Sequence, residues 1–583
     1  MRSHQGTMHR SALTACALML AGVAHAVAPD APVNDFALLD QNGKFHHLYY
    51  LSDAKAVVLM AHDNECAATA GAVADLEHTK ETFADRGVEF LMINVDDSRQ
   101  SVAAQIKQTG TSIPVLVDEM QLVGPSLQLQ RAGEVLVIDP KGWKVAYRGP
   151  LARKSGNALL TGALDAVLAG KPVKSSKVAA KGCALKVGTQ QRNQAGKNIS
   201  YAQQIAPLLA DNCVTCHRTG GIGPFPMSSH AIVQGFSPMI REVILTRRMP
   251  PWHADPHVGT FEGARSLTKE QAQTLVHWIE AGSPRGDGPD PLAALNKQWP
   301  EWVFGEPDLV VKVPAYDVPA TGTVDYQRYT IPNNTGRDIW IRASDTLPGD
   351  RSVVHHVLVG VYDPKLPDRE RAVRASSGEL GAYVPGNGPV MYPEGTGVLV
   401  PKDCSFAFQL HYTTSGKASR DETRVGFYFS KEPPQYEFKT AVMFKPTIKI
   451  PANTKAYTDS TTYEFPREVI VYSLTPHAHY RGSASNFVAR YPDGREELLL
   501  SVPKYDFNWQ TTYSLVTPLR IPAGTRIVHS TTYDNSAQNP ANPDPNRVVP
   551  WGEQSWDEML YGVVHYREVT PVGTQVSKVA DNK

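Results

Sequence analysis

The stretch from residue 289 to residue 570 is dense in short runs of Val, Tyr and Thr that Pro and Gly residues separate. Such runs favour β-strands, and no convincing long helical pattern interrupts them. One sandwich typically needs roughly 100 residues, so a segment of about 280 residues predicts two packed sandwiches. We therefore expect two all-β, jelly-roll-like sandwich domains, at residues 300–440 and 441–570.

The first half of the 583-residue chain divides into three further blocks. Residues 30–170 alternate strand-like and helix-like segments, which predicts an α/β domain. Residues 171–199 are rich in Lys, Gly, Ala and Ser and lack Asp and Glu, which is typical of a linker. Residues 200–288 are helical in pattern and predict an all-α domain. The expected strands are Ala56–Ala61, Val88–Val95, Pro114–Val117 and Glu134–Ile138, and the expected helices are Gly71–Asp85, Tyr201–Ala210 and Leu267–Ala281.

The N-terminus has the pattern of an export signal over residues 1–26. Arg2 and Arg10 precede an apolar run, and Ala24-His25-Ala26 offers the small residues that a signal peptidase reads. We expect cleavage near Ala26 and a periplasmic or secreted mature chain. No later stretch reaches the roughly 20 apolar residues of a membrane span. Lys+Arg and Asp+Glu both number 58, which gives no electrostatic reason to expect a nucleic acid partner.

A Cys-Val-Thr-Cys-His run at residues 213–217 is the pattern for covalent attachment of haem c. The thiols of Cys213 and Cys216 would bond to the porphyrin, and His217 would lie beneath the iron. We expect Met249 as the sixth ligand, because the two prolines after it stiffen the loop that aims its thioether. Methionine–histidine ligation suits electron transfer. The alternative sixth ligands are Met227, Met239, His230 and His253.

Five histidines and one methionine of the strand-rich half form a candidate metal-binding set. An imidazole suits several metals, whereas a thioether favours Cu(I) over zinc, and no carboxylate clusters with these histidines to suggest iron. Two histidines spaced two apart on a strand point to one face. Two adjacent histidines need a strand end or a bulge to reach one ion. The set is His355, His356, His411, His477, His479 and Met559.

With these residues in this order, residues 300–570 resemble the copper type II, ascorbate-dependent monooxygenases, the group of peptidylglycine α-hydroxylating and dopamine β-monooxygenases. The resemblance implies two copper ions, the first held by three histidines, the second by two histidines and the methionine. It also implies that O2 reacts at the second ion and that a C–H bond is hydroxylated. The substrate-binding residues do not carry over, and only Cys404 remains where the animal enzymes are rich in disulfides. The matching segments are Val354-His355-His356-Val357, Gln409-Leu410-His411-Tyr412, Pro476-His477-Ala478-His479 and Asp557-Glu558-Met559.

Residues 30–170 resemble the redoxin branch of the thioredoxin fold. Cys66 follows an apolar strand at a helix start, where the helix N-terminus would lower the pKa of its thiol. The usual second cysteine is missing, because position 69 is Thr, and Gly133 takes the place of the usual cis-proline. Two interpretations remain open. Cys66 pairs with Cys183 as a redox or structural couple, or the module is a docking scaffold with an inert thiol.

These features together predict an oxidoreductase that hydroxylates a small molecule or peptide with O2. The haem module would relay electrons to the first copper, from an ascorbate-like reductant or a redox protein. Two alternatives belong to other classes. One is a periplasmic copper-binding protein without catalysis, and the other is an electron-transfer protein whose sandwiches are a scaffold.

Overall fold

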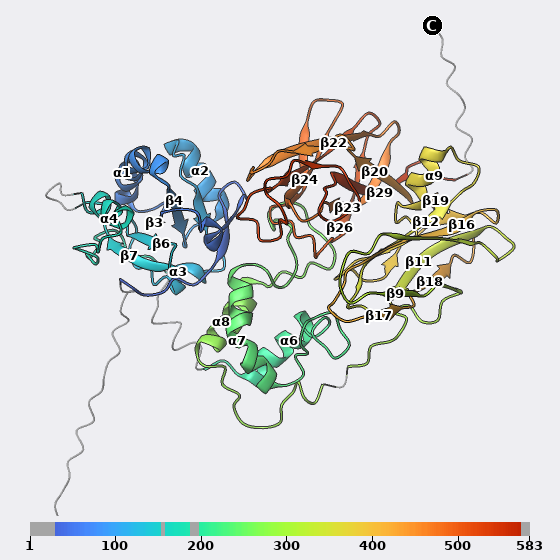
Figure 1. The fold of residues 1–583 in the computed structure, drawn as a ribbon, viewed down its shortest axis with the longest axis horizontal. Coiled ribbons are helices and arrows are strands. Elements are labelled where there is room, and N and C mark those ends of the chain that lie inside the picture. Colours follow the sequence, from blue (N-terminus) through green and yellow to red (C-terminus); the bar gives the residue numbers. More distant parts are fainter. Residues whose placement is uncertain (1–28, 153–157, 187–197, 296, 573–583) are drawn as a thin grey trace, which may run out of the picture.

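The computed structural model describes residues 29–152, 158–186, 198–295 and 297–572 (Figure 1). The export signal predicted over residues 1–26 lies outside the described residues. None of the helices in the described ranges has the length and apolar character needed to cross a membrane.

The N-terminal part is an α/β unit built on a seven-stranded sheet of order β2-β1-β5-β4-β3-β6-β7. Strands β3, β4 and β5 run parallel, and the others pair antiparallel. Every residue of β3 is buried, because both faces of this central strand are covered. The bounds are β1 (Ala37–Asp40), β2 (Phe45–His47), β3 (Ala56–His62), β4 (Val88–Asn94), β5 (Val115–Val117), β6 (Val135–Asp139), β7 (Lys144–Gly149), α1 (Ala67–Phe83), α2 (Arg99–Thr109), α3 (Val123–Ser126) and α4 (Leu159–Leu168).

All four predicted strands of this unit are present, with ends shifted by one residue. The predicted helix Gly71–Asp85 begins earlier, at Ala67, because Cys66 takes the N-cap position directly after the loop that follows β3. Gly71 lies inside the helix without breaking it.

Much of the predicted linker belongs to the α/β unit instead. Backbone bridges join Arg148 to Lys177 and Arg131 to Ala184, so the chain runs along the edge of the sheet. A disulfide joins Cys66 to Cys183. Of the two interpretations left open by the sequence, the structure therefore agrees with the one in which these cysteines pair. The physical reason is that the edge strand β7 and the turn before β6 have backbone groups that need partners.

The helical block contains α6 (Ala206–Asn212), α7 (His230–Leu245) and α8 (Lys269–Glu280). The helix expected at Tyr201–Ala210 starts as a π-helical turn and continues as α6, and α7 was not predicted. Trp278 of α8 is fully buried and stacks on Tyr201. One hydrophobic core runs from this block into one face of the α/β sheet, so the two parts share buried surface.

The strand-rich half contains two pairs of sheets, each pair enclosing its own core (Figure 1). In the first sandwich, sheet β10-β16-β12-β13 faces sheet β19-β15-β11-β18-β8. In the second, sheet β20-β29-β23-β26 faces sheet β22-β27-β24-β25. The bounds are β8 (Leu309–Lys312), β10 (Gln327–Pro332), β11 (Ile339–Leu347), β12 (Val354–Tyr362), α9 (Asp368–Ala375), β13 (Gly381–Tyr383), β15 (Thr396–Val400), β16 (Ser405–Tyr412), β18 (Arg424–Phe429), β19 (Tyr436–Glu437), β20 (Lys439–Phe444), β22 (Tyr457–Glu464), β23 (Val469–His477), β24 (Gly482–Arg490), β25 (Glu496–Val502), β26 (Tyr513–Ile521), β27 (Arg526–Tyr533) and β29 (Tyr561–Glu568).

The segment before α8 attaches the second sandwich to the α/β unit. Arg99 of α2 forms a two-pronged ion pair with Asp255, at 2.7 and 2.8 Å, and Asp255 is 3% exposed. The Asp255 N–H donates to Ser501 of the second sandwich. Because a buried two-pronged pair fixes both distance and orientation, these parts have a defined relative placement.

We expect loss of the Cys66–Cys183 cross-link to destabilise the α/β unit. The bond closes a sequence separation of 117 residues, so a Cys183→Ser variant should lose about 2–4 kcal/mol of unfolding free energy. Hydrogen–deuterium exchange of β3 and β4 peptides in urea would measure it for this unit alone. Reduction of the disulfide in the wild type should give the same loss of unfolding free energy. The same reducing conditions should not destabilise the Cys183→Ser variant further. Equal protection in oxidised wild type and variant would contradict the prediction.

Candidate metal centres

His355, His356 and His411 form a compact buried cluster in the first sandwich. Their nearest ligand atoms all lie within 4.8 Å of one another. His356 pairs with His411 across β12 and β16, and a register shift lies between Val354 and His356. This irregularity is the bulge that two adjacent histidines require, and it turns His355 toward the other two.

Four of the six imidazole nitrogens of this cluster lack hydrogen-bond partners among the described residues. This holds for Nδ1 and Nε2 of His355, Nε2 of His356 and Nδ1 of His411. Burial lowers the pKa of His355 to about 3 and that of His411 to about 4, so these imidazoles are neutral. Buried polar atoms without partners are costly and rare, and neutral imidazoles are the form that binds a metal. The cluster therefore fits a metal ion.

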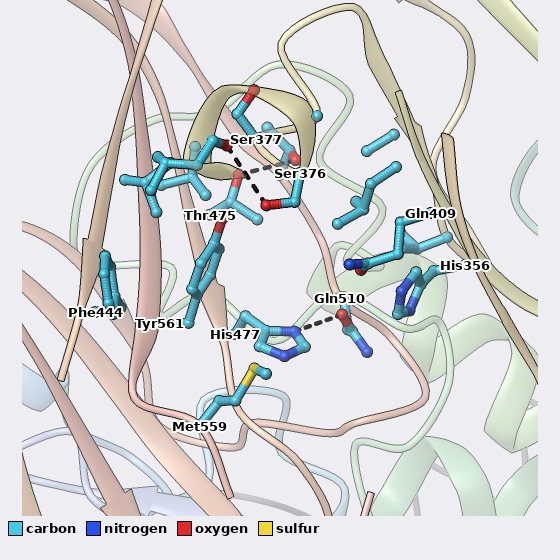
Figure 2. A pocket seen from close by; sticks show the side chains of 18 of the residues that line it. His356, Ser376, Ser377, Gln409, Phe444, Thr475, His477, Gln510, Met559 and Tyr561 are labelled. Atoms are coloured by element: carbon cyan, nitrogen blue, oxygen red, sulfur yellow. Dashed lines mark hydrogen bonds between the residues drawn. The ribbon is translucent and has the colours of Figure 1, made fainter. Parts of the chain in front are cut away.

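His477 and His479 form a second cluster in the other sandwich. His477 is the last residue of β23, whereas His479 lies in the turn beyond it, so the expectation that both lie on one strand is wrong for His479. The two rings are nevertheless 5.2 Å apart. Figure 2 shows the sulfur of Met559 beside His477. The turn after β23 thus brings the two imidazoles together, as the alternation of side chains along a strand would also have done.

Hydrogen bonds orient both rings of this cluster. The Nδ1 atom of His477 lies 2.7 Å from Oε1 of Gln510, whose Nε2 donates to the Phe507 carbonyl. Nδ1 of His479 lies 3.3 Å from the Asp557 carbonyl. Since these oxygens only accept, each Nδ1 carries the proton, and each Nε2 keeps its lone pair for a ligand bond.

The Glu558 carboxylate joins the two segments that carry His479 and Met559. Its oxygens accept the backbone N–H groups of His479 at 2.8 Å, Met559 at 3.2 Å and Arg481. The side chain is fully buried. Burial raises the pKa of Glu558, while the three N–H donors and the Arg481 guanidinium lower it and so favour the carboxylate form. One carboxylate thus sets the spacing of two candidate ligands.

The two clusters border one cavity of about 280 Å³ between the sandwiches, lined by His356, His477 and Met559 among others. Phe507 stacks on His355, with ring centroids 4.5 Å apart, and meets His479 edge-on at 5.8 Å. A single aromatic ring therefore contacts both clusters.

The Cys-x-x-Cys-His motif lies in the turn after α6. Cys213 and Cys216 are free thiols, and Nδ1 of His217 lies 3.0 Å from the Phe225 carbonyl. This contact assigns the proton to Nδ1 and leaves the lone pair of Nε2 free to bind a metal ion. Cys216 borders a second cavity, of about 540 Å³, between the helical block and the first sandwich. The free thiols, the oriented imidazole and the adjacent space fit a haem.

The expected sixth ligand, Met249, lies after α7 and is half-buried. Its role stays a prediction. Of the alternatives, the Met227 N–H donates to the His217 carbonyl, and Met239 is 49% exposed. Nε2 of His230 is engaged by the Ser283 carbonyl. His253 is buried. Burial, and to a smaller extent the charge of nearby Lys504, lowers the pKa of His253 to about 4.

Sequence reasoning missed Phe507, Gln510 and the role of Glu558. Nothing in the local pattern around Phe507 and Gln510 sets them apart, since they act through contacts far away in the chain. An acidic residue directly before Met559 was a usable signal for Glu558, because a buried carboxylate needs donors.

Comparison with known proteins gives one family match. The model of the AhpC/TSA family matches residues 29–148. Residues 29–148 form a redoxin module. The chain is also similar to a tyramine beta-hydroxylase of Caenorhabditis briggsae, with 22% identity over 269 residues, which are 40% of this chain and 43% of that protein. The chain thus spans less than half the length of this relative.

Two solved structures are similar to part of the chain. A hypothetical protein from Sinorhizobium meliloti is 24% identical, with a TM-score of 0.26, and the match covers 28% of this chain and 97% of that one. Peroxidoxin BcpB from Mycobacterium tuberculosis is 18% identical, with a TM-score of 0.21, over 26% and 99% of the two chains. The fold of the redoxin module rests on its own sheet order and on the family match. The redoxin match and the weak hydroxylase match support an oxidoreductase.

We expect a Glu558→Gln variant to loosen the second cluster. A carboxamide has one acceptor oxygen in place of two, so at least one of the buried N–H groups of His479, Arg481 and Met559 loses its partner. The loss should cost about 1–3 kcal/mol of unfolding free energy, measured by urea denaturation. The matched control is Glu553→Gln, whose side chain is 52% exposed, and which should cost less than about 1 kcal/mol. Equal stability of the two variants would contradict the role given to Glu558.

Proposed function

We propose that this protein is a copper-dependent monooxygenase that hydroxylates a C–H bond with O2. His355, His356 and His411 would hold one copper ion, and His477, His479 and Met559 a second. The observation that carries the proposal is the set of buried imidazole nitrogens without partners among the described residues, at two places that border one cavity. Copper, when bound, supplies the one-electron and O2 chemistry that such a hydroxylation requires.

The residues of the chain have separate tasks in this reaction. Gln510 and the Asp557 carbonyl hold the Nδ1 protons of His477 and His479, which keeps each Nε2 directed outward as a ligand. The cavity holds the substrate between the clusters and limits the access of water. A copper-binding protein without catalysis has no use for such a space, which favours the enzyme over that alternative.

Cys213, Cys216 and His217 would hold a haem c, which supplies one electron at a time when bound. The cavity beside Cys216 and the cavity between the clusters have Ala382 and Asn387 in common. A single segment of the first sandwich therefore separates the haem motif from the candidate copper residues. This short separation supports a relay of electrons from the haem module, with an ascorbate-like reductant or a redox protein as the external donor.

Removal of the thioether should abolish hydroxylation. We expect Met559→Ala to lower product formation by more than about 100-fold. This is more than the loss that typically follows mutation of a residue that only hydrogen-bonds to a metal ligand. Mass spectrometry of products formed under labelled O2, from a panel of small apolar compounds and amines, would measure it. The control is Met391→Ala, since Met391 is 54% exposed. Labelled product at the wild-type rate in Met559→Ala would contradict the assigned site.

The relay makes a separate prediction. His217→Ala should slow turnover at least about tenfold with a redox-protein donor, because a haem held at this motif would lose the histidine that binds it. Turnover with ascorbate in excess should fall less. His78→Ala is the control, because that side chain is 84% exposed on α1. Unchanged turnover with the protein donor would contradict the relay and leave the copper chemistry standing.

A further inference from the structure

We infer that the substrate is an uncharged, largely apolar molecule of about one ring with a short side chain, which the Tyr561 hydroxyl holds by a hydrogen bond. The inference rests on the proposed function and adds the substrate class. It starts from the cavity between the two clusters (Figure 2).

The cavity offers almost no charge to a ligand. Among the described residues that line it, Glu553 is the one with a formal charge. Glu553 is half-exposed and pairs with Arg328 at 2.6 Å, so its charge is already balanced and screened by solvent. Burial lowers the pKa of the lining His565 to about 4, so this imidazole is neutral. An ammonium or carboxylate entering the cavity would lose hydration and gain no partner.

Most polar groups of the lining are already engaged within the protein. Ser376 donates to the Ala372 carbonyl, and Ser377 donates to the Arg374 carbonyl. Thr475 donates to Thr512. These groups lie at the end of the cavity away from Met559 (Figure 2). A ligand with several polar groups would find few donors there, which favours an apolar body.

Tyr561 and Tyr326 are the exceptions among the lining tyrosines, because neither hydroxyl makes a hydrogen bond with a described residue, and Tyr561 is the one that lies beside His477. Its ring lies 5.8 Å from the His477 ring, and its hydroxyl makes no hydrogen bond with any described residue. A hydroxyl that faces a cavity can bind one polar group of a ligand. The Tyr561 hydroxyl points toward Thr475, so that contact would hold the polar end of the ligand away from Met559 and leave its apolar body toward Met559 and His477 (Figure 2).

The volume sets the size of the ligand. An apolar cavity of about 150 Å³ takes a benzene molecule. The cavity here holds about 280 Å³, which allows one ring and a side chain of a few atoms. A larger substrate would have to leave most of its mass outside.

The test is binding to the copper-free full chain, measured by isothermal titration calorimetry with three ligands that share a ring and differ in charge. We expect 2-phenylethanol to bind at least about tenfold more tightly than 2-phenylethylammonium or 3-phenylpropanoate. Equal or tighter binding of either ion would overturn the inference. A failure of 2-phenylethanol to bind at millimolar concentrations would also overturn the inference.

Two variants and one control variant sharpen the test. Val373 lines the cavity from α9, a helix without buried residues, so Val373→Glu should fold and should bind 2-phenylethylammonium about tenfold more tightly than the wild type. Arg369→Glu adds the same side chain on the exposed side of α9 and should change binding little. Tyr561→Phe should weaken 2-phenylethanol about threefold to tenfold and leave ethylbenzene unchanged. Weakening of both ligands alike would contradict the anchor.

These binding results separate two kinds of failure. If the neutral ligand is preferred but no labelled hydroxyl product forms, the proposed chemistry fails and the cavity assignment stands. If an amine is both bound and hydroxylated, the chemistry stands and the substrate class is wrong.

Discussion

Three backbone N–H groups donate to the buried Glu558 carboxylate, and two of them belong to the candidate ligands His479 and Met559. The turn after β23 and the segment before β29 are far apart in the chain, yet this carboxylate holds them together. The third N–H is that of Arg481, whose guanidinium bonds to Asn535 and to the Trp556 carbonyl. The ligand positions of the second cluster are therefore fixed by the protein itself, and such preorganisation is what a metal site needs.

The segment from Phe507 to Gln510 extends this arrangement to the first cluster. Phe507 stacks on His355 and meets His479, while Gln510 orients His477. The two sandwiches therefore cannot shift against each other without disturbing both clusters. Gln510 and His477 line the cavity between them, so its shape depends in part on the packing that positions the candidate ligands. The space beside Cys216 shares Ala382 and Asn387 with this cavity, so a haem bound there would lie close to the candidate copper residues.

Local patterns predicted much of this architecture. Short apolar runs between helix-like segments located the strands of the redoxin module, and the adjacency of His355 and His356 predicted the bulge in β12. Patterns failed where a long-range contact decides the outcome. The course of residues 171–186 along the sheet edge depends on Cys66 and on β7, which lie far back in the chain. His479 lies in a turn because Glu558 holds its backbone, and Gln510 is a partner of His477 only once β23 and the following loop are folded.

The most direct test of this account is the copper-to-haem ratio of the full chain matured in a periplasm, with the EPR spectrum of the oxidised protein. We expect two copper ions per haem and the signal of mononuclear Cu(II) bound by nitrogen. Copper near zero after copper-replete growth would contradict it, because the buried histidines would then have another purpose. In that case the electron-transfer alternative, with the sandwiches as scaffold, would take its place.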